Sequence, residues 1–266
     1  MKIYISSDIE GTCALCDWDE AMPGGANYSY FAKLMTKEVA CACNGAIDAG
    51  WEVTVKDAHN TARNIDPQML PAQAMLIRAW TGDMFEMLGG ITADKYDAIG
   101  FTGYHSDAFS DGNPLSHTMV RKVNRVTIND INASEFVINM FTAGHLGIPV
   151  VFLSGDEALC RQAKKLVPGI TTVPTKNVIG GATITRHPDE VCKDIREGLA
   201  QALKNPDKSS CMVKMPEHFR IVIDYKEWLD ANKYCNYPGA KREDIKTISF
   251  ESDDYIEIIR FIMFCM

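Results

Sequence analysis

The stretch KIYISSDIEGT, residues 2–12, decides how this chain is organised. Residues 2–7 are mostly apolar or β-branched, which is typical of a strand buried on both faces of a sheet. Asp8 and Glu10 follow directly, just before Gly11. Functional groups of an open α/β sheet gather beyond the carboxyl ends of its strands. The stretch therefore predicts a buried strand that presents two carboxylates at one edge of a sheet.

Strand and helix patterns then alternate along the first two thirds of the chain. Short apolar runs predict further strands, and apolar residues at helical spacing predict helices. This order favours a three-layer α/β/α domain with a mainly parallel sheet. We expect strands at residues 2–7, 51–57, 96–103 and 148–156, and helices at 27–49, 132–147 and 157–168.

The pattern changes after about residue 175, where a smaller α+β part is expected. We therefore predict a catalytic α/β domain at 1–175 and a smaller part at 176–266 that contributes to oligomer contacts. Within this part we expect helices at 188–204 and 253–264 and strands at 212–225 and 247–252.

Two further segments give weaker signals. Residues 117–130 have the composition of extended chain, with a hairpin expected around Lys122–Arg125. Residues 82–90, GDMFEMLGG, favour a core helix over a substrate pocket.

Composition excludes several classes of protein. The net charge of −8 and the lack of a basic run argue against nucleic-acid binding, which requires clustered Lys and Arg. No signal peptide is expected, and no apolar run approaches the ~18 residues of a membrane span. The nine scattered cysteines, including Cys13 and Cys16 in a lone CxxC, indicate reduced thiols. We expect a cytoplasmic protein with no membrane partner.

Polar candidates follow each of the first three predicted strands. Asp57 and His59 follow the second strand in KDAHN, and His105 follows the third in GYHS. His117 lies twelve residues further on in PLSHT, and Glu135 lies near the start of a predicted helix. Because the carboxyl ends of parallel strands meet at one edge, we expect these side chains to converge.

The pair Asp8 and Glu10 indicates what this edge could bind. In an extended Asp-x-Glu both carboxylates point the same way, so they repel each other and one takes up a proton unless a cation lies between them. A set of carboxylates and imidazoles suits a pair of zinc ions with one bridging carboxylate. Zinc acidifies water, which then serves as a nucleophile near neutral pH.

Each candidate also has an ordinary explanation. Asp8 could be an N-cap or a loop residue, and His59 and His105 could be loop histidines bonded to backbone. Glu135 could be a first-turn glutamate that the helix dipole favours. Their joint occurrence at the strand ends of one sheet favours a metal site.

The motifs SSDIEGT, KDAHN, GYHS…PLSHT and INDINASEFVIN resemble those of the zinc-dependent D-aminopeptidases. The resemblance runs in the same order from the N-terminus through AGHLGIPVVFLSGDE, residues 143–157, and is loose beyond. It implies a self-compartmentalising homo-oligomer, a decamer, that removes an N-terminal D-Ala or Gly from short peptide substrates.

The same resemblance implies a site with two zinc ions per chain, although other divalent metals suit the residues as well. Asp8 would bridge the metals, Glu10 and His105 would complete one zinc, and His59 and Glu135 the other. The five ligands follow from the motifs more firmly than their division between the metals. His117 would be the catalytic histidine, either as nucleophile or, as we prefer, as a helper of the attacking water or of the oxyanion.

Two other readings of the same residues stay open. The chain could be another dinuclear hydrolase acting on amides or phosphate esters, or a non-catalytic, metal-stabilised oligomer that binds peptides. Three polar residues are also ambiguous: Asp57 could bond a ligand imidazole or cap a loop, and Asn129 and Asp130 could orient ligands or form a turn.

Overall fold

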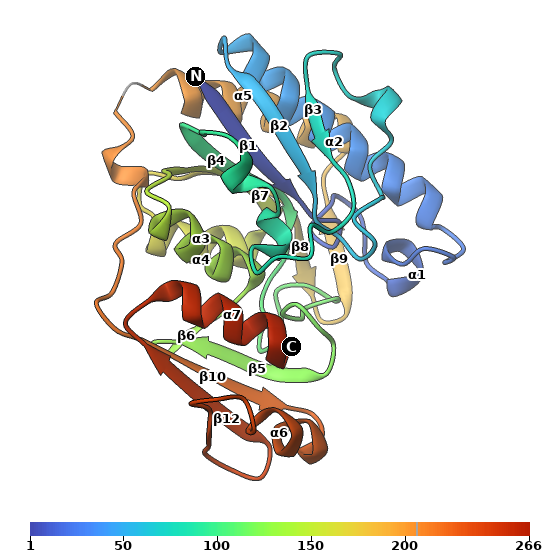
Figure 1. Cartoon of the computed structure of the whole chain (residues 1–266). Helices are drawn as coiled ribbons and strands as arrows, with labels where there is room; N and C mark the ends of the chain where they lie inside the picture. The colour runs from blue at the N-terminus through green and yellow to red at the C-terminus, as the bar shows by residue number, and fades with distance from the viewer. Residues whose placement is uncertain (206) are drawn as a thin grey trace.

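The computed structural model describes residues 1–205 and 207–266 and contains two sheets, shown in Figure 1. The larger sheet has the strand order β3-β2-β1-β4-β7-β8-β9, and every pairing is parallel except that of β8 with β9. The predicted α/β class with a mainly parallel sheet is therefore confirmed. Its strands are β1 (Lys2–Ser7), β2 (Glu52–Asp57), β3 (Met75–Ile77), β4 (Ala98–Tyr104), β7 (Val150–Asp156), β8 (Thr171–Ile179) and β9 (Ala182–Thr185).

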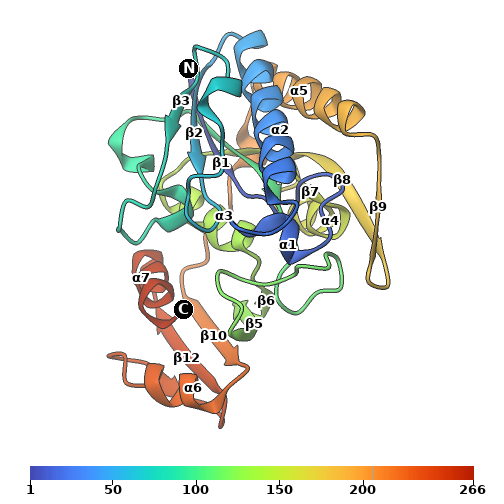
Figure 2. The same cartoon turned by 90° about the vertical axis from the view of Figure 1, so that its right-hand side faces the viewer.

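Helices cover both faces of this sheet, and two hydrophobic cores lie between them (Figure 2). Side chains alternate along β1, so Ile3 and Ile5 join the core beneath α2 and α5, while Tyr4 joins the core beneath α3 and α4. None of the described helices combines the length and apolarity needed to cross a membrane. The helices are α1 (Trp18–Ala21), α2 (Tyr28–Asp48), α3 (Glu135–His145), α4 (Glu157–Leu166), α5 (Pro188–Lys204), α6 (Trp228–Tyr234) and α7 (Tyr255–Cys265).

The smaller sheet is antiparallel, with the order β11-β12-β10-β5-β6. Helix α7 packs against it and against α3, and Figure 1 shows α7 between the two parts. The buried Tyr255 of α7 donates a hydrogen bond to the Ile138 carbonyl of α3 at 2.8 Å, which ties the two parts together. The strands are β5 (Val123–Ile128), β6 (Ile131–Asn132), β10 (Phe219–Tyr225), β11 (Lys241–Arg242) and β12 (Thr247–Ser252).

The two sheets do not divide the chain at residue 175. That residue lies inside β8, and the following β9 and α5 belong to the larger part. Conversely, β5 and β6 come from the middle of the chain and join the smaller sheet. The division into 1–175 and 176–266 stays a prediction about folding units, whereas sheet membership crosses it in both directions.

Two local predictions were wrong. No hairpin turn occurs at Lys122–Arg125, because Val123–Ile128 forms one strand. The turn lies instead at Asn129 and Asp130, whose φ angles of 48° and 65° join β5 to β6. Residues 82–90 form only a short 3₁₀ helix, Glu86–Leu88, because glycines at both ends break the pattern.

The strands β3, β8 and β9 carry little sequence signal. β3 has three residues, and β8 is polar and contains Pro174. Their place in the sheet follows from pairing with neighbouring strands rather than from an apolar pattern of their own.

Candidate metal centre

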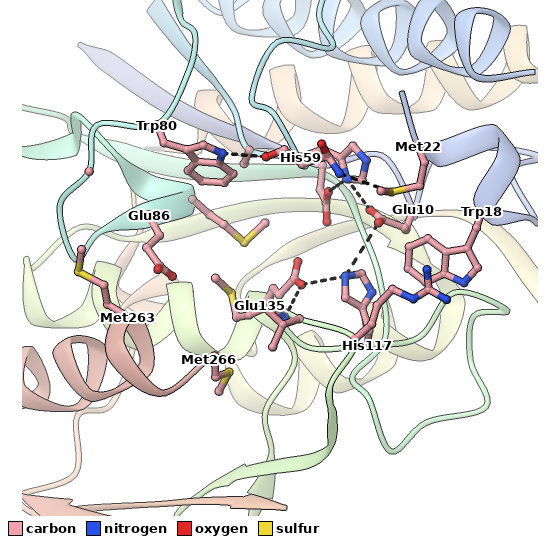
Figure 3. Close-up of a pocket in the computed structure, with 18 of the residues that line it drawn as sticks. Glu10, Trp18, Met22, His59, Trp80, Glu86, His117, Glu135, Met263 and Met266 are labelled. Carbon is pink, nitrogen blue, oxygen red and sulfur yellow. Dashed lines mark hydrogen bonds and ion pairs between the residues drawn. The ribbon is translucent and has the colours of Figure 1, made fainter. Parts of the chain in front are cut away.

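Six residues singled out in the sequence meet at the carboxyl ends of β1, β2 and β4, and Figure 3 labels four of them, Glu10, His59, His117 and Glu135. His59 Nδ1 lies 3.2 Å from Asp8 Oδ1 and 3.1 Å from Glu10 Oε2. His105 Nε2 lies 3.5 Å from Asp8 Oδ2 and 3.4 Å from Glu135 Oε2. Loops that are far apart in the sequence therefore bring three carboxylates and their imidazole neighbours into one buried cluster.

The distances divide the cluster into two sets that share Asp8. One set is Asp8, Glu10 and His59, the other is Asp8, His105 and Glu135, and a third group of donors, Glu10, His105 and His117, overlaps both. The family resemblance implied another division, in which Glu10 goes with His105. The third group brings these two residues together as well, so the division between the metals stays a prediction. The His59 ring lies nearest to Asp8 and Glu10, and the His105 ring lies nearest to Asp8 and Glu135.

His117 lies beside both sets. Its Nε2 is 3.6 Å from Glu135 Oε1 and 4.0 Å from Glu10 Oε1. Its ring stacks on that of His105 with centroids 4.4 Å apart, and Trp18 packs edge-on against it at 5.3 Å. This imidazole therefore faces the gap between the two sets.

Each of the three imidazoles uses one nitrogen to bond a backbone carbonyl. A neutral imidazole carries only one N–H, so the nitrogen that faces the carboxylates keeps a free lone pair. This is the orientation in which histidine binds a cation or accepts a proton. The bonds are His59 Nε2 to Ala21 O at 2.8 Å, His105 Nδ1 to Ser106 O at 2.9 Å and His117 Nδ1 to Leu115 O at 2.9 Å.

The cluster concentrates negative charge out of water. Asp8, Glu10 and Glu135 are at most 3% exposed. Burial, and then the neighbouring Glu10, raises the pKa of Asp8 well above its usual value. Among the described residues, Asp8 Oδ2, Glu10 Oε2 and His105 Nε2 have no hydrogen-bond partner. Buried oxygen and nitrogen donors of this kind fit divalent cations such as zinc.

Close backbone contact fixes the loop that carries Asp8 and Glu10. The Asp8 N–H bonds Thr102 O at 2.9 Å, and the Gly11 N–H bonds Gly103 O at 2.7 Å. A Cβ on Gly103 would come within 2.2 Å of Asp8 O, and the φ of this glycine is +68°. Only glycine allows this approach, so Gly103 sets the position of the Asp8 carboxylate.

Asp57 caps a loop and does not bond the His59 ring. Its carboxylate accepts hydrogen bonds from the Asn64 N–H and side-chain amide and from the Ile65 N–H, at 2.5–2.8 Å. Asn64 also donates to His59 O at 2.6 Å. The carboxylate therefore closes the loop that carries His59. Asn129 and Asp130, the other ambiguous pair, form a plain turn away from the cluster.

Asp156 is a structural residue of the site that sequence reasoning missed. It accepts hydrogen bonds from the Ser106 N–H and hydroxyl at 2.7 and 2.6 Å, and from the Asn113 amide at 3.2 Å. Asn113 also donates to Glu10 O at 3.0 Å. Asp156 thus anchors the loop between His105 and His117. Its position between an apolar strand and a helix was an available signal for an N-cap.

Lys176 and Glu38 were also missed. Lys176 is almost fully buried, and its Nζ donates hydrogen bonds to Glu10 O and Leu15 O at 2.5 Å each. These two bonds fix the backbone of the loop after β1. Glu38 lies on the buried face of α2 and accepts a hydrogen bond from the Cys13 N–H at 2.8 Å. A lone carboxylate on the apolar face of a predicted helix was the signal for Glu38. Lys176 gave none, because its strand was not predicted.

A pocket of about 370 Å³ opens in front of the cluster, within the range of small-ligand sites. Figure 3 shows Trp80 and Glu86 on one side, Trp18 and Met22 on the other, and Met263 and Met266 of the C-terminal segment below. The segment 82–90 contributes Gly82, Asp83, Glu86 and Met87 to this wall, so the preference for a core helix over a substrate pocket was wrong.

Three comparisons with known proteins agree with one another. The model of peptidase family M55, described as D-aminopeptidase, matches residues 1–264. A D-aminopeptidase from Bacillus subtilis strain 168 is 30% identical over 262 residues, which cover 97% of this chain and 93% of that protein. The solved structure described as "Zn-dependent D-aminopeptidase DppA from Bacillus subtilis, a self-compartmentalizing protease" is similar with a TM-score of 0.91 and 28% identity, covering 100% of this chain and 96% of that chain.

The buried Glu38 predicts a pH dependence of stability. Burial raises the pKa of this carboxyl from 4.5 to about 8, although the hydrogen bond from the Cys13 N–H and the charge of Lys176 each lower it. Its contribution to the free energy of unfolding is therefore fully present below pH 4.5 and is lost as the pH rises through 8. The loss is at most about 1.4 kcal/mol per pH unit. In denaturant unfolding between pH 5 and 9, the free energy of unfolding of Glu38→Gln should fall less steeply with rising pH than that of wild type.

The exposed Glu197→Gln, on α5, is the matched control and should keep the wild-type slope. Equal slopes for wild type and Glu38→Gln would show that this carboxyl does not titrate in that range.

Proposed function

The chain belongs to peptidase family M55, the D-aminopeptidases, and on that premise we propose that it removes the N-terminal residue from short peptides with the help of two zinc ions. The best candidates for that residue are small: D-alanine or glycine. The observation that carries the proposal is the convergence of Asp8, Glu10, Glu135 and the imidazoles of His59, His105 and His117 in one cluster at the wall of one pocket.

We divide the proposed metal ligands according to the two sets that share Asp8. Asp8 would lie between the ions, Glu10 and His59 would hold one, and His105 and Glu135 the other. When bound, zinc supplies Lewis acidity toward a carbonyl oxygen and acidifies water. The backbone bonds on the far side of His59 and His105 hold the ring tautomers that such binding requires.

His117 is proposed as the residue that moves the proton. The Nδ1–H···O bond to Leu115 leaves Nε2 as the acceptor, directed at the space between Glu10 and Glu135. From there Nε2 takes a proton from the attacking water and delivers it to the departing amine, as a general base and then a general acid. Stacking on His105 and contact with Trp18 fix the plane of the ring.

Replacement of His117 tests this role. His117→Ala should lower kcat on D-Ala-D-Ala by about 10²- to 10⁴-fold, the usual contribution of general acid–base catalysis, without loss of zinc or fold. The exposed His145→Ala, at the end of α3, is the matched control. Zinc content, circular dichroism and turnover of D-Ala-D-Ala, L-Ala-L-Ala and p-nitrophenyl phosphate are measured together. Unchanged hydrolysis by His117→Ala would remove it from the mechanism, and phosphatase activity without peptide turnover would favour another hydrolase.

The zinc content of variants tests whether each of the two sets that share Asp8 binds one metal ion. Wild type should bind two zinc ions per chain, Asp8→Ala should retain none firmly, and His59→Ala should retain one, because only Asp8 belongs to both sets. Mass spectrometry of dialysed protein provides the counts, with the exposed His187→Ala as control. One zinc in wild type, or loss of both in His59→Ala, would contradict the proposed division.

We also propose that the chain forms a closed homo-oligomer, a decamer, as the description of the Bacillus subtilis relative as self-compartmentalizing supports. Exposed apolar side chains offer contact surface, among them Ile179 and Ile184 on the β8–β9 hairpin that projects in Figure 2, and Leu229 on α6. Light scattering should give a mass near ten times 29.5 kDa, and a mass of 29.5 kDa would refute assembly.

A further inference from the structure

One carboxylate of the pocket is not part of the metal cluster. Glu86 is half-buried in the wall of the pocket, at the start of a 3₁₀ helix, and its backbone has a φ of +45°, which a non-glycine residue rarely adopts. Its carboxylate makes no hydrogen bond or ion pair within residues 1–205 and 207–266. Glu135 and Asp83 lie close enough to repel its charge. A cation placed in the pocket would give the Glu86 carboxylate a partner and would offset its repulsion by Glu135 and Asp83.

One cation of the pocket is also without a partner. Arg121 is exposed at the pocket, and its guanidinium carbon lies 4.3 Å from the centroid of the Trp18 ring. No carboxylate of the described chain pairs with it. Stacking on Trp18 limits its rotamers, so its N–H groups are held ready for an anion.

These two charges lie on opposite sides of the catalytic residues. Figure 3 shows Glu86 on one side and Trp18, on which Arg121 stacks, on the other, with Glu10, Glu135 and His117 between them. A substrate that places its reacting carbonyl near His117 therefore has a negative group on one side and a positive group on the other.

We propose that Glu86 binds the α-ammonium and Arg121 the terminal carboxylate of a free dipeptide, an assignment that rests on the proposed aminopeptidase function. In a dipeptide the ammonium and the carboxylate flank the scissile bond within one residue on each side. The two residues extend about 7 Å, so both charged ends fit within one pocket of this size. Glu86 and Arg121 thus define the substrate as a short zwitterionic peptide with both ends unblocked.

The ammonium site also explains the direction of cleavage. A carboxylate at a fixed place beside the catalytic groups accepts only a peptide whose free amine lies next to the scissile carbonyl. An internal bond offers an uncharged amide at that place and would leave Glu86 unpaired. This contact selects exopeptidase over endopeptidase cleavage.

Binding to inactive enzyme separates recognition from chemistry. In zinc-loaded His117→Ala, isothermal titration calorimetry is carried out with D-Ala-D-Ala, its N-acetyl derivative and its C-terminal amide. Glu86→Gln should weaken the binding of D-Ala-D-Ala by about 10- to 100-fold, as expected for loss of a charged hydrogen bond, and should leave the affinity for the N-acetyl peptide unchanged. Arg121→Gln should weaken the binding of D-Ala-D-Ala by a similar factor and should leave the affinity for the C-terminal amide unchanged. Arg121→Lys should restore part of the loss.

The matched controls are the exposed Glu197→Gln and Arg161→Gln, on α5 and α4. In the enzyme with His117 intact, Glu86→Gln should raise KM for D-Ala-D-Ala by the same factor with little change in kcat, because the ammonium is held before and during the reaction. Circular dichroism and the melting temperature verify that each variant is folded.

The results distinguish failure of this assignment from failure of the proposed function. If Glu86→Gln or Arg121→Gln weakened the binding of free and blocked peptides equally, that residue would not be the one that binds the charged end. An unchanged KM of Glu86→Gln in active enzyme would also overturn its assignment. Charge-selective binding of dipeptides without any hydrolysis would uphold the assignment and overturn the proposed peptidase activity.

Discussion

Electrostatic repulsion among Asp8, Glu10 and Glu135 is the constraint on which the rest of the structure depends. Each carboxylate is excluded from water, and burial together with Glu10 raises the pKa of Asp8, while, despite burial, the neighbouring imidazoles lower the pKa of Glu10 and Glu135. The parallel sheet places Asp8 and Glu10 at the edge where β2 and β4 also end, and the first turn of α3 brings Glu135 to the same place. The fold thus gathers buried negative charge that divalent cations would neutralise.

The surrounding groups hold this arrangement through backbone contacts rather than through long side-chain networks. The close approach at Gly103, the bonds from Lys176 to Glu10 O, and the carbonyl partners of the imidazoles each fix one part of the cluster. Most are buried, where an unmade hydrogen bond is costly. A site built in this way is preorganised, which is the property that binding and catalysis require.

The smaller sheet matters to the site because it positions α7. This helix packs against α3, which carries Glu135, and residues Met263 and Met266 complete the pocket wall. Asp8, Glu10, His59 and His105 of the cluster follow strands of the larger sheet, whereas Glu135 follows β6 of the smaller sheet and the pocket wall needs both parts. Variation in the smaller part would change the shape offered to substrate.

The sequence by itself determined the class of fold and the membership of the cluster. Apolar runs such as 2–7 and 148–156 identify buried parallel strands, and the polar residues after them, Asp8 and His59 among them, are local features of the chain. The tertiary structure alone decided which imidazole lies beside which carboxylate, and it alone revealed Lys176, Glu86 and Arg121. These depend on how loops from separate strands cross and pack. No periodic pattern encodes such long-range contacts, because each residue looks like an ordinary surface or strand residue in its own segment.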